Sequence, residues 1–225
     1  MEALTLDDLL ASVPVTEFVH VGVDLGQRVD PTAIVVAEGQ RRDYALDRHG
    51  HGQLEGGELH YLVRVIERLP LGTSYPNVVG RLVEINRSLG VRDQRFWVDA
   101  TGVGQPVIDL LDDAGLLVVP VYLTATDRAD RAGRDLRLGK ALMVSRLQVL
   151  LQSARIHLPQ TTEARALVDE LLNYEIRVSE DAHAQFGAFK TGTHDDLATA
   201  LGLACWEEGQ GWAWGLPPAG VFDRR

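Results

Sequence analysis

Two short apolar runs that each end in an aspartate constrain the fold of this chain more than any other feature. The first run ends at Asp24 and the second at Asp99, and Gly26 and Gly102 follow them closely. Glycine lets the backbone turn sharply or approach a ligand. Apolar runs of this length are typical of buried strands, and carboxylates at the carboxyl ends of strands line the crevice of an open α/β sheet. The two segments therefore predict an α/β fold with an acidic sheet edge.

Hydrophobic periodicity predicts the remaining elements. We expect strands at residues 18–26, 59–70, 95–99, 116–123 and 156–159, and a pair of strands within 32–50 joined at Gly39–Gln40. Helices are predicted at 77–90, 105–115, 141–154, 162–174 and 194–208, and a hairpin at 174–190. Residues 124–140 show no apolar periodicity, so we expect an exposed loop there. The order predicts a mixed central sheet flanked by helices.

A third acidic segment, Asp195 and Asp196, opens the helix predicted at 194–208. The N–H groups and the positive end of that helix face the same point. Carboxylates without thiolates suit hard cations such as Mg²⁺ or Mn²⁺, and two such ions about 4 Å apart can hydrolyse a phosphodiester. A single aspartate is more often a turn former or a helix cap. The prediction of a metal site therefore depends on the ordered set of three acidic segments.

The three segments together resemble the RNase H-like nuclease domain of tailed-phage terminase large subunits. The matching stretches are GVDLGQRVDPTAIVV, VDATGVGQPVIDLL and GTHDDLATALGLA, within a resemblance that covers residues 19–207. It implies an RNase H-like fold and a two-metal endonuclease that cuts double-stranded viral DNA during genome packaging. The catalytic and metal-binding residues would be Asp24, Asp99, Asp195 and Asp196, with Asp195 favoured over Asp196 as the principal ligand.

The sequence departs from a complete terminase subunit in one respect: it contains no G-x-x-x-x-G-K-[ST] phosphate loop. We therefore expect a packaging ATPase or a portal complex to be a separate partner. Two alternatives stay open. The same acidic residues would serve another RNase H-like nuclease, such as a junction resolvase or an RNA–DNA hybrid nuclease. The chain could also be a non-catalytic DNA-binding subunit of a packaging complex.

Basic residues recur through the expected loop at intervals of three, and Lys190 precedes the last helix. Arginine suits phosphate through its bidentate fork. The predicted DNA contacts are Arg128, Arg131, Arg134, Lys140 and Lys190. Salt bridges to the interleaved aspartates are the alternative. His194 is a possible accessory metal or phosphate contact, although a histidine beside a helix cap usually has no such role.

The net charge of -10 opposes binding to the phosphates of DNA, so we expect the protein alone to bind DNA weakly. The positive charge of the bound cations should offset part of this repulsion. We expect one nuclease domain at 18–208, an N-terminal extension at 1–17 and a flexible C-terminal tail at 209–225. No apolar run is long enough for a membrane span and no leader pattern is evident, so we expect no membrane partner and a cytoplasmic location, in the host cell if the protein is viral.

The remaining metal-binding residue types give weaker signals. The single cysteine, Cys205, excludes an internal disulfide and lies in an apolar run, as a small buried residue would. His49 and His51, with His60 beyond them, lack a fourth ligand at a spacing suited to zinc, so we expect an ordinary Gly-rich loop.

Overall fold

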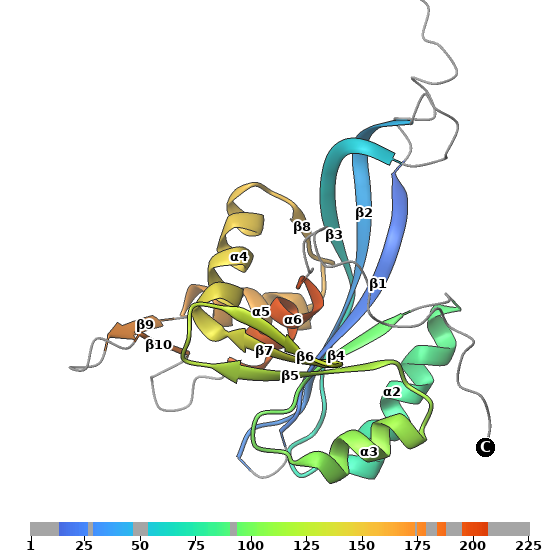
Figure 1. The fold of residues 1–225 in the computed structure, drawn as a ribbon, viewed down its shortest axis with the longest axis vertical. Helices are drawn as coiled ribbons and strands as arrows, with labels where there is room; N and C mark the ends of the chain where they lie inside the picture. The colour runs from blue at the N-terminus through green and yellow to red at the C-terminus, as the bar shows by residue number, and fades with distance from the viewer. Residues whose placement is uncertain are drawn as a thin grey trace, which may run out of the picture.

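The fold is built on one mixed eight-stranded sheet with helices on both faces (Figure 1). The computed structural model describes residues 14–26, 29–46, 54–90, 94–173, 175–178, 184–187 and 195–206. The strand order is β6-β7-β5-β4-β1-β2-β3-β8, and a separate hairpin pairs β9 (Glu175–Val178) with β10 (Ala184–Gly187). The α/β class with a mixed sheet, expected from the sequence, is confirmed.

The centre of the sheet joins antiparallel and parallel strands. β1 (Val15–Asp24) pairs with β2 (Ala33–Leu46) in antiparallel fashion and with β4 (Arg95–Asp99) in parallel. β3 (Leu54–Arg68) extends the antiparallel side and carries the two-residue edge strand β8 (Ile156–His157). On the other side lie β5 (Val118–Thr124), β7 (Asp135–Gly139) and β6 (Ala129–Ala132).

Two helical layers cover the sheet. α2 (Tyr75–Leu89) and α3 (Gln105–Asp113) pack on one face, where Val78, Leu82 and Ile108 meet alternate residues of β1 and β4. The opposite face is covered by α4 (Lys140–Gln152), α5 (Thr162–Leu172) and α6 (Asp196–Ala204) (Figure 1). The sheet centre is therefore buried on both faces, as its continuous apolar runs require.

Two local predictions, the end of α2 and the burial of Cys205, are confirmed. α2 ends at Gly90, whose φ of 59° is left-handed, as expected for a glycine that terminates a helix. Cys205 is buried, and burial raises the pKa of its thiol to about 12. Within the described residues, none of the helices combines the length and apolar composition needed to cross a membrane. His49 and His51 lie outside the described residues.

The expected turn at Gly39–Gln40 is wrong, because β2 runs through both residues as one strand. Gly39 is a packing residue: a Cβ atom there would lie 2.3 Å from Cζ of Phe18, its neighbour on β1. The glycine thus provides space for an aromatic ring on the adjacent strand. A strand glycine that admits a neighbouring ring looks the same in sequence as a turn glycine.

The expected exposed loop at residues 124–140 is also wrong. The segment forms the hairpin β6–β7, and β7 pairs in parallel with β5. Leu136 and Leu138 alternate along β7 and are both buried against Trp97 and Met143. Two alternate leucines among arginines and aspartates are too short an apolar pattern to stand out in the sequence.

Candidate metal site

The first two acidic segments meet because β1 and β4 are neighbours in register. Asp24 is the direct partner of Asp99 in the parallel ladder. Neighbouring strands lie about 4.8 Å apart, and paired residues point to the same face of the sheet. The preceding residues, Val23 and Val98, are fully buried in the core under α2 and α3. The two carboxylates therefore lie side by side on the opposite face, which α6 covers.

Gly22 allows α6 to lie directly on β1. A Cβ atom at Gly22 would lie 2.0 Å from the carbonyl oxygen of Ala200 and 2.6 Å from the backbone nitrogen of Ala204. All residues of α6 are buried. This close approach brings the start of the helix, with Asp195 as its N-cap residue, to the carboxyl ends of β1 and β4.

The electrostatics of Asp24 reflect this crowding. Burial raises its pKa well above the usual value, and repulsion from Asp99, Asp196 and Asp195 raises it further. The pKa of Asp99 is also raised, chiefly by burial, although a hydrogen bond from the Thr101 N–H, 2.8 Å from Oδ1, opposes the shift. The structure thus brings together all four aspartates that the sequence singled out. A cation would relieve their mutual repulsion.

Lys140 places a positive charge among these carboxylates. Its Nζ lies 3.1 Å from Oδ2 of Asp195, and its charge lowers the pKa of both Asp24 and Asp99. Lys140 begins α4 directly after Gly139, where a Cβ atom would lie 2.1 Å from the carbonyl oxygen of Thr126. This tight junction between β7 and α4 sets the position of the lysine.

Two functional candidates, Arg68 and Glu170, were missed by the sequence analysis. Arg68 ends β3 and pairs with Ala33, which in turn pairs with Asp24, so these residues form one row across the sheet. Its Nε donates to Oδ2 of Asp196 at 2.7 Å, and its Nη2 forms an ion pair with Glu170. Asp196 is 3% exposed, so the arginine compensates a buried carboxylate.

Glu170 extends this network to the backbone of α6. Its Oε2 accepts a hydrogen bond from the Ala198 N–H at 3.0 Å, and burial raises its pKa to about 6. The sequence did carry a signal for this residue. Glu170 follows Ala164 and Leu167 at intervals of three on the buried face of α5, where an acidic side chain requires a partner.

The donor set suits a hard divalent cation, because every candidate ligand is a carboxylate oxygen. In the present conformation, no three His, Cys, Asp or Glu side chains of the described residues converge closely enough to hold a metal ion. Lys140 and Arg68 instead pair with Asp195 and Asp196. The side chain of Asp195 is 31% exposed.

The basic residues predicted to contact DNA occupy different environments. The side chain of Arg128 is 78% exposed, with Asp127 at 3.7 Å. Arg131 lies over the Trp97 ring, 5.9 Å from its centroid, and donates to the carbonyl of Arg134. Arg134 forms a bidentate salt bridge with Asp112, in which Nη1 donates to Oδ1 at 2.8 Å and Nη2 to Oδ2 at 2.6 Å. Lys190 and His194 lie outside the described residues.

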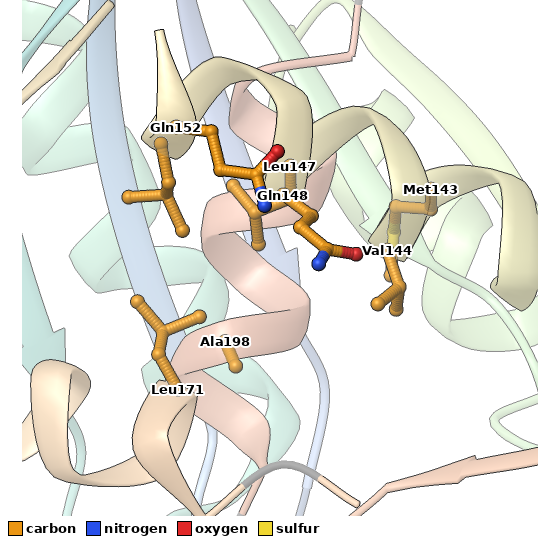
Figure 2. A pocket seen from close by; sticks show the side chains of 8 residues that line it. Met143, Val144, Leu147, Gln148, Gln152, Leu171 and Ala198 are labelled. Carbon is orange, nitrogen blue, oxygen red and sulfur yellow. The ribbon is translucent and has the colours of Figure 1, made fainter. Parts of the chain in front are cut away.

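A pocket between α4, α5 and α6 is chemically unlike the carboxylate site (Figure 2). Its lining consists of Met143, Val144, Leu147, Gln148, Leu151, Gln152, Leu171 and Ala198. No side chain in this lining titrates, so the pocket offers no general acid, general base or anionic metal ligand for hydrolysis.

Comparison with known proteins finds solved structures with a similar fold. No protein-family model matches the sequence, and no curated protein matches it. The large terminase nuclease of thermophilic phage G20c is 20% identical, over 83% of this chain and 80% of that chain, with a TM-score of 0.59. The large terminase nuclease domain of Thermus phage P74-26 is 19% identical, over 83% and 77%, with a TM-score of 0.55.

The large terminase of bacteriophage HK97 is 16% identical and matches over 88% of this chain but 41% of that chain, with a TM-score of 0.50. At these identities the likeness concerns the arrangement of strands and helices. The fold expected from the resemblance, that of a large terminase nuclease domain, is thereby confirmed. The chain therefore has the fold of the large terminase nuclease domains.

Proposed function

We propose that this chain is a metal-dependent endonuclease that cleaves double-stranded DNA during viral genome packaging. The observation that carries the proposal is the pairing of Asp24 with Asp99 in register, beneath a helix that opens with Asp195 and Asp196. The shared fold supports it, since structures of the G20c large terminase nuclease contain bound magnesium or cobalt. The proposed cofactors are two divalent cations, Mg²⁺ or Mn²⁺.

Each residue of the site has a distinct part in the proposed reaction. Asp24 and Asp99 would hold a cation between the two strands, and Asp195 would complete the set. Such ions lower the pKa of a bound water and stabilise the leaving oxygen of the phosphodiester. Arg68 donates a hydrogen bond to Asp196, and Glu170 accepts one from the Ala198 N–H in the first turn of α6. Both interactions fix the position of the helix start. Lys140 would place its positive charge near the scissile phosphate.

The proposed partners are double-stranded DNA and a separate packaging ATPase or portal complex, in the cytoplasm of the host cell. The proposed nuclease domain spans residues 18–208. Of the predicted DNA contacts, Arg128 is the most accessible in the described residues, with its side chain 78% exposed. Arg131, Arg134 and Lys140 contact protein groups, so DNA contact by these residues would require rearranged side chains.

The test is incubation of supercoiled plasmid with the protein in Mg²⁺, in Mn²⁺ and in chelator. We expect nicking and linearisation only with a metal. Asp24→Asn, Asp99→Asn and Asp195→Asn should each reduce the rate by at least about 100-fold, the size of loss seen when charge stabilisation of a transition state is removed, because each variant lacks a carboxylate charge that the metal ions need. Asp113→Asn is the matched control, since Asp113 is an exposed aspartate at the end of α3. Near-normal cleavage by any of the three site variants would reject that residue.

The same assay separates the alternative functions. Four-way junctions and RNA–DNA hybrids should be cut more slowly than linear duplex DNA. A clear preference for either substrate would favour a junction resolvase or a hybrid nuclease. A folded protein that binds duplex DNA but cuts no substrate in either metal would indicate a non-catalytic packaging subunit.

A further inference from the structure

Arg146, a half-buried residue of α4, connects the carboxyl end of α6 to the sheet. Its Nε donates a hydrogen bond to the Cys205 carbonyl at 3.1 Å, and its Nη2 donates one to the Tyr61 hydroxyl at 2.7 Å. The guanidinium also lies over the Trp206 ring, 5.8 Å from its centroid. Tyr61 belongs to β3 and is fully buried, so its hydroxyl has a fixed position. The arginine thus links α4, α6 and β3.

These contacts suit the end of a buried helix. The last carbonyl groups of a helix have no partner within it, and they carry its partial negative charge. Because α6 is buried along its whole length, its terminal carbonyls need partners from the protein. Arg146 provides one for the C-cap residue, Cys205, through a charge-assisted hydrogen bond. The arginine therefore satisfies this carbonyl and balances the partial charge at the same time.

Both ends of α6 are bound by side chains of α4. Lys140 begins α4 and pairs with Asp195 at the start of α6, while Arg146, farther along the same helix, binds the carbonyl at the end of α6. Hydrophobic contacts are non-directional, whereas hydrogen bonds require a defined geometry. The two polar contacts therefore determine how far α6 lies along α4.

We propose that Arg146 is a positioning residue for the metal site: by binding the carboxyl end of α6, it sets where Asp195 and Asp196 lie at the other end. A helix rises about 1.5 Å per residue, so Cys205 lies about 14 Å along the axis from Asp196. Arg146 therefore acts on the site through the helix. The inference rests on the proposed nuclease function, because it concerns the candidate ligands of that site.

The deciding variant is Arg146→Met, which keeps an unbranched side chain beside Trp206 but removes both hydrogen bonds and the charge. Plasmid cleavage and the melting temperature are each measured against the concentration of Mg²⁺ or Mn²⁺. We expect the concentration that gives half-maximal cleavage to rise about 10-fold, the lower end of the loss typical for outer partners of metal ligands. The rate at saturating metal should stay near that of the wild type, because no candidate ligand has been changed.

Two controls separate positioning from stability. Arg87→Met removes an exposed arginine from the last turn of α2, on the opposite face of the sheet, and should leave the metal requirement unchanged. Ile108→Val, in the core beneath α2 and α3, should lower the melting temperature without changing the metal requirement. Tyr61→Phe removes only the hydroxyl and should raise the metal requirement less than Arg146→Met does.

The proposal is rejected if Arg146→Met melts at a lower temperature, as Ile108→Val does, but keeps the wild-type metal requirement. If Arg146→Met does not fold, Tyr61→Phe is judged by the same criterion. A different result would overturn the proposed nuclease function itself, together with any positioning role at its site: a wild-type protein whose melting temperature and cleavage do not respond to either metal.

Discussion

At the scale of single residues, the site is a balance between crowded carboxylates and two basic side chains. The sequence identified the four aspartates because each lies beside an apolar run, a local pattern. Arg68 and Glu170 contact Asp196 and Ala198 from 128 and 28 residues away in sequence. The sequence gives little indication of such long-range polar pairs. Here the indication was an acidic residue on the apolar face of α5.

The raised pKa of Asp24 predicts how pH affects the metal-free protein. The folded state retains a proton that the unfolded chain loses near the ordinary value of 3.8, so stability falls as pH rises through the folded pKa. Asp24→Asn removes this loss. In chelator, the variant should melt several degrees above the wild type at neutral pH, since 1 kcal/mol moves the melting temperature of a domain of this size by about 2–4 °C.

Thermal melts of both proteins between about pH 4 and about pH 8 test this prediction, because the range spans the ordinary Asp value and neutrality. The gap should widen as pH rises. Millimolar Mg²⁺ or Mn²⁺ should then raise the melting temperature of the wild type and not of the variant. Parallel pH profiles in chelator would contradict the crowding of Asp24.

Glu170 is predicted to position Asp196 rather than to contact the substrate. Glu170→Gln preserves the shape and an acceptor for the Ala198 N–H but removes the charge that faces Arg68. Loss of such an outer partner typically costs about 10- to 100-fold in metal affinity or activity. The metal concentration that gives half of the maximal cleavage rate should therefore be higher in this variant.

Metal titrations of plasmid cleavage measure this shift. Asp169→Asn is the control, because Asp169 is the adjacent exposed acid on the same helix. A purely structural role for Glu170 would lower the melting temperature and leave the metal requirement unchanged.

At the scale of secondary structure elements, the closeness of α6 to β1 builds the site. Gly22→Ala should push the helix away from the strand, because the added methyl group would meet the backbone of Ala200 and Ala204. Overpacking of this kind costs about 1–3 kcal/mol. We expect a lower melting temperature and slower cleavage, as the α6 aspartates move away from Asp24.

Gly80→Ala is the matched control for this prediction. Gly80 lies on α2 with nothing within 4 Å of an added Cβ atom, and alanine stabilises a helix interior by about 1 kcal/mol relative to glycine. This variant should melt slightly above the wild type. If Gly22→Ala behaved like the control, the contact between α6 and β1 would not set the site.

Most elements could be predicted from the sequence because their apolar period is long enough to read, as in α2. The hairpin β6–β7 could not, because only Leu136 and Leu138 mark its buried face. At Gly39 the sequence predicted a turn where the structure has a continuous strand. The glycine is there because the space of a side chain is occupied by Phe18. In both places, packing against a residue that is distant in the sequence decides the conformation: Phe18 for Gly39, and Trp97 for the two leucines.

At the scale of the whole molecule, the net charge of -10 opposes DNA binding. Contact with phosphates must then come from local positive charge, and Arg128, with its side chain 78% exposed, is the most accessible of the predicted DNA contacts that the structure describes. Arg128→Ala should weaken duplex binding and reduce the slope of log affinity against log salt by about 0.9. Arg134→Ala should instead lower stability, because Arg134 is paired with Asp112.

Filter-binding titrations at several salt concentrations measure the slopes. They are best done with the cleavage-defective Asp99→Asn protein, so that the DNA stays intact. An unchanged slope for Arg128→Ala would remove this residue from the DNA-binding surface.

The pairing of Asp24 with Asp99 has a consequence for how such a chain can diverge. Their spacing is set by ladder hydrogen bonds between β1 and β4, whereas the chain between them passes through β2, β3 and α2. Surface connections tolerate insertions and deletions far better than strands do. Relatives can therefore lengthen or shorten the loops that join these elements without moving one carboxylate relative to the other. The chemistry is thereby insulated from most changes in the connecting loops.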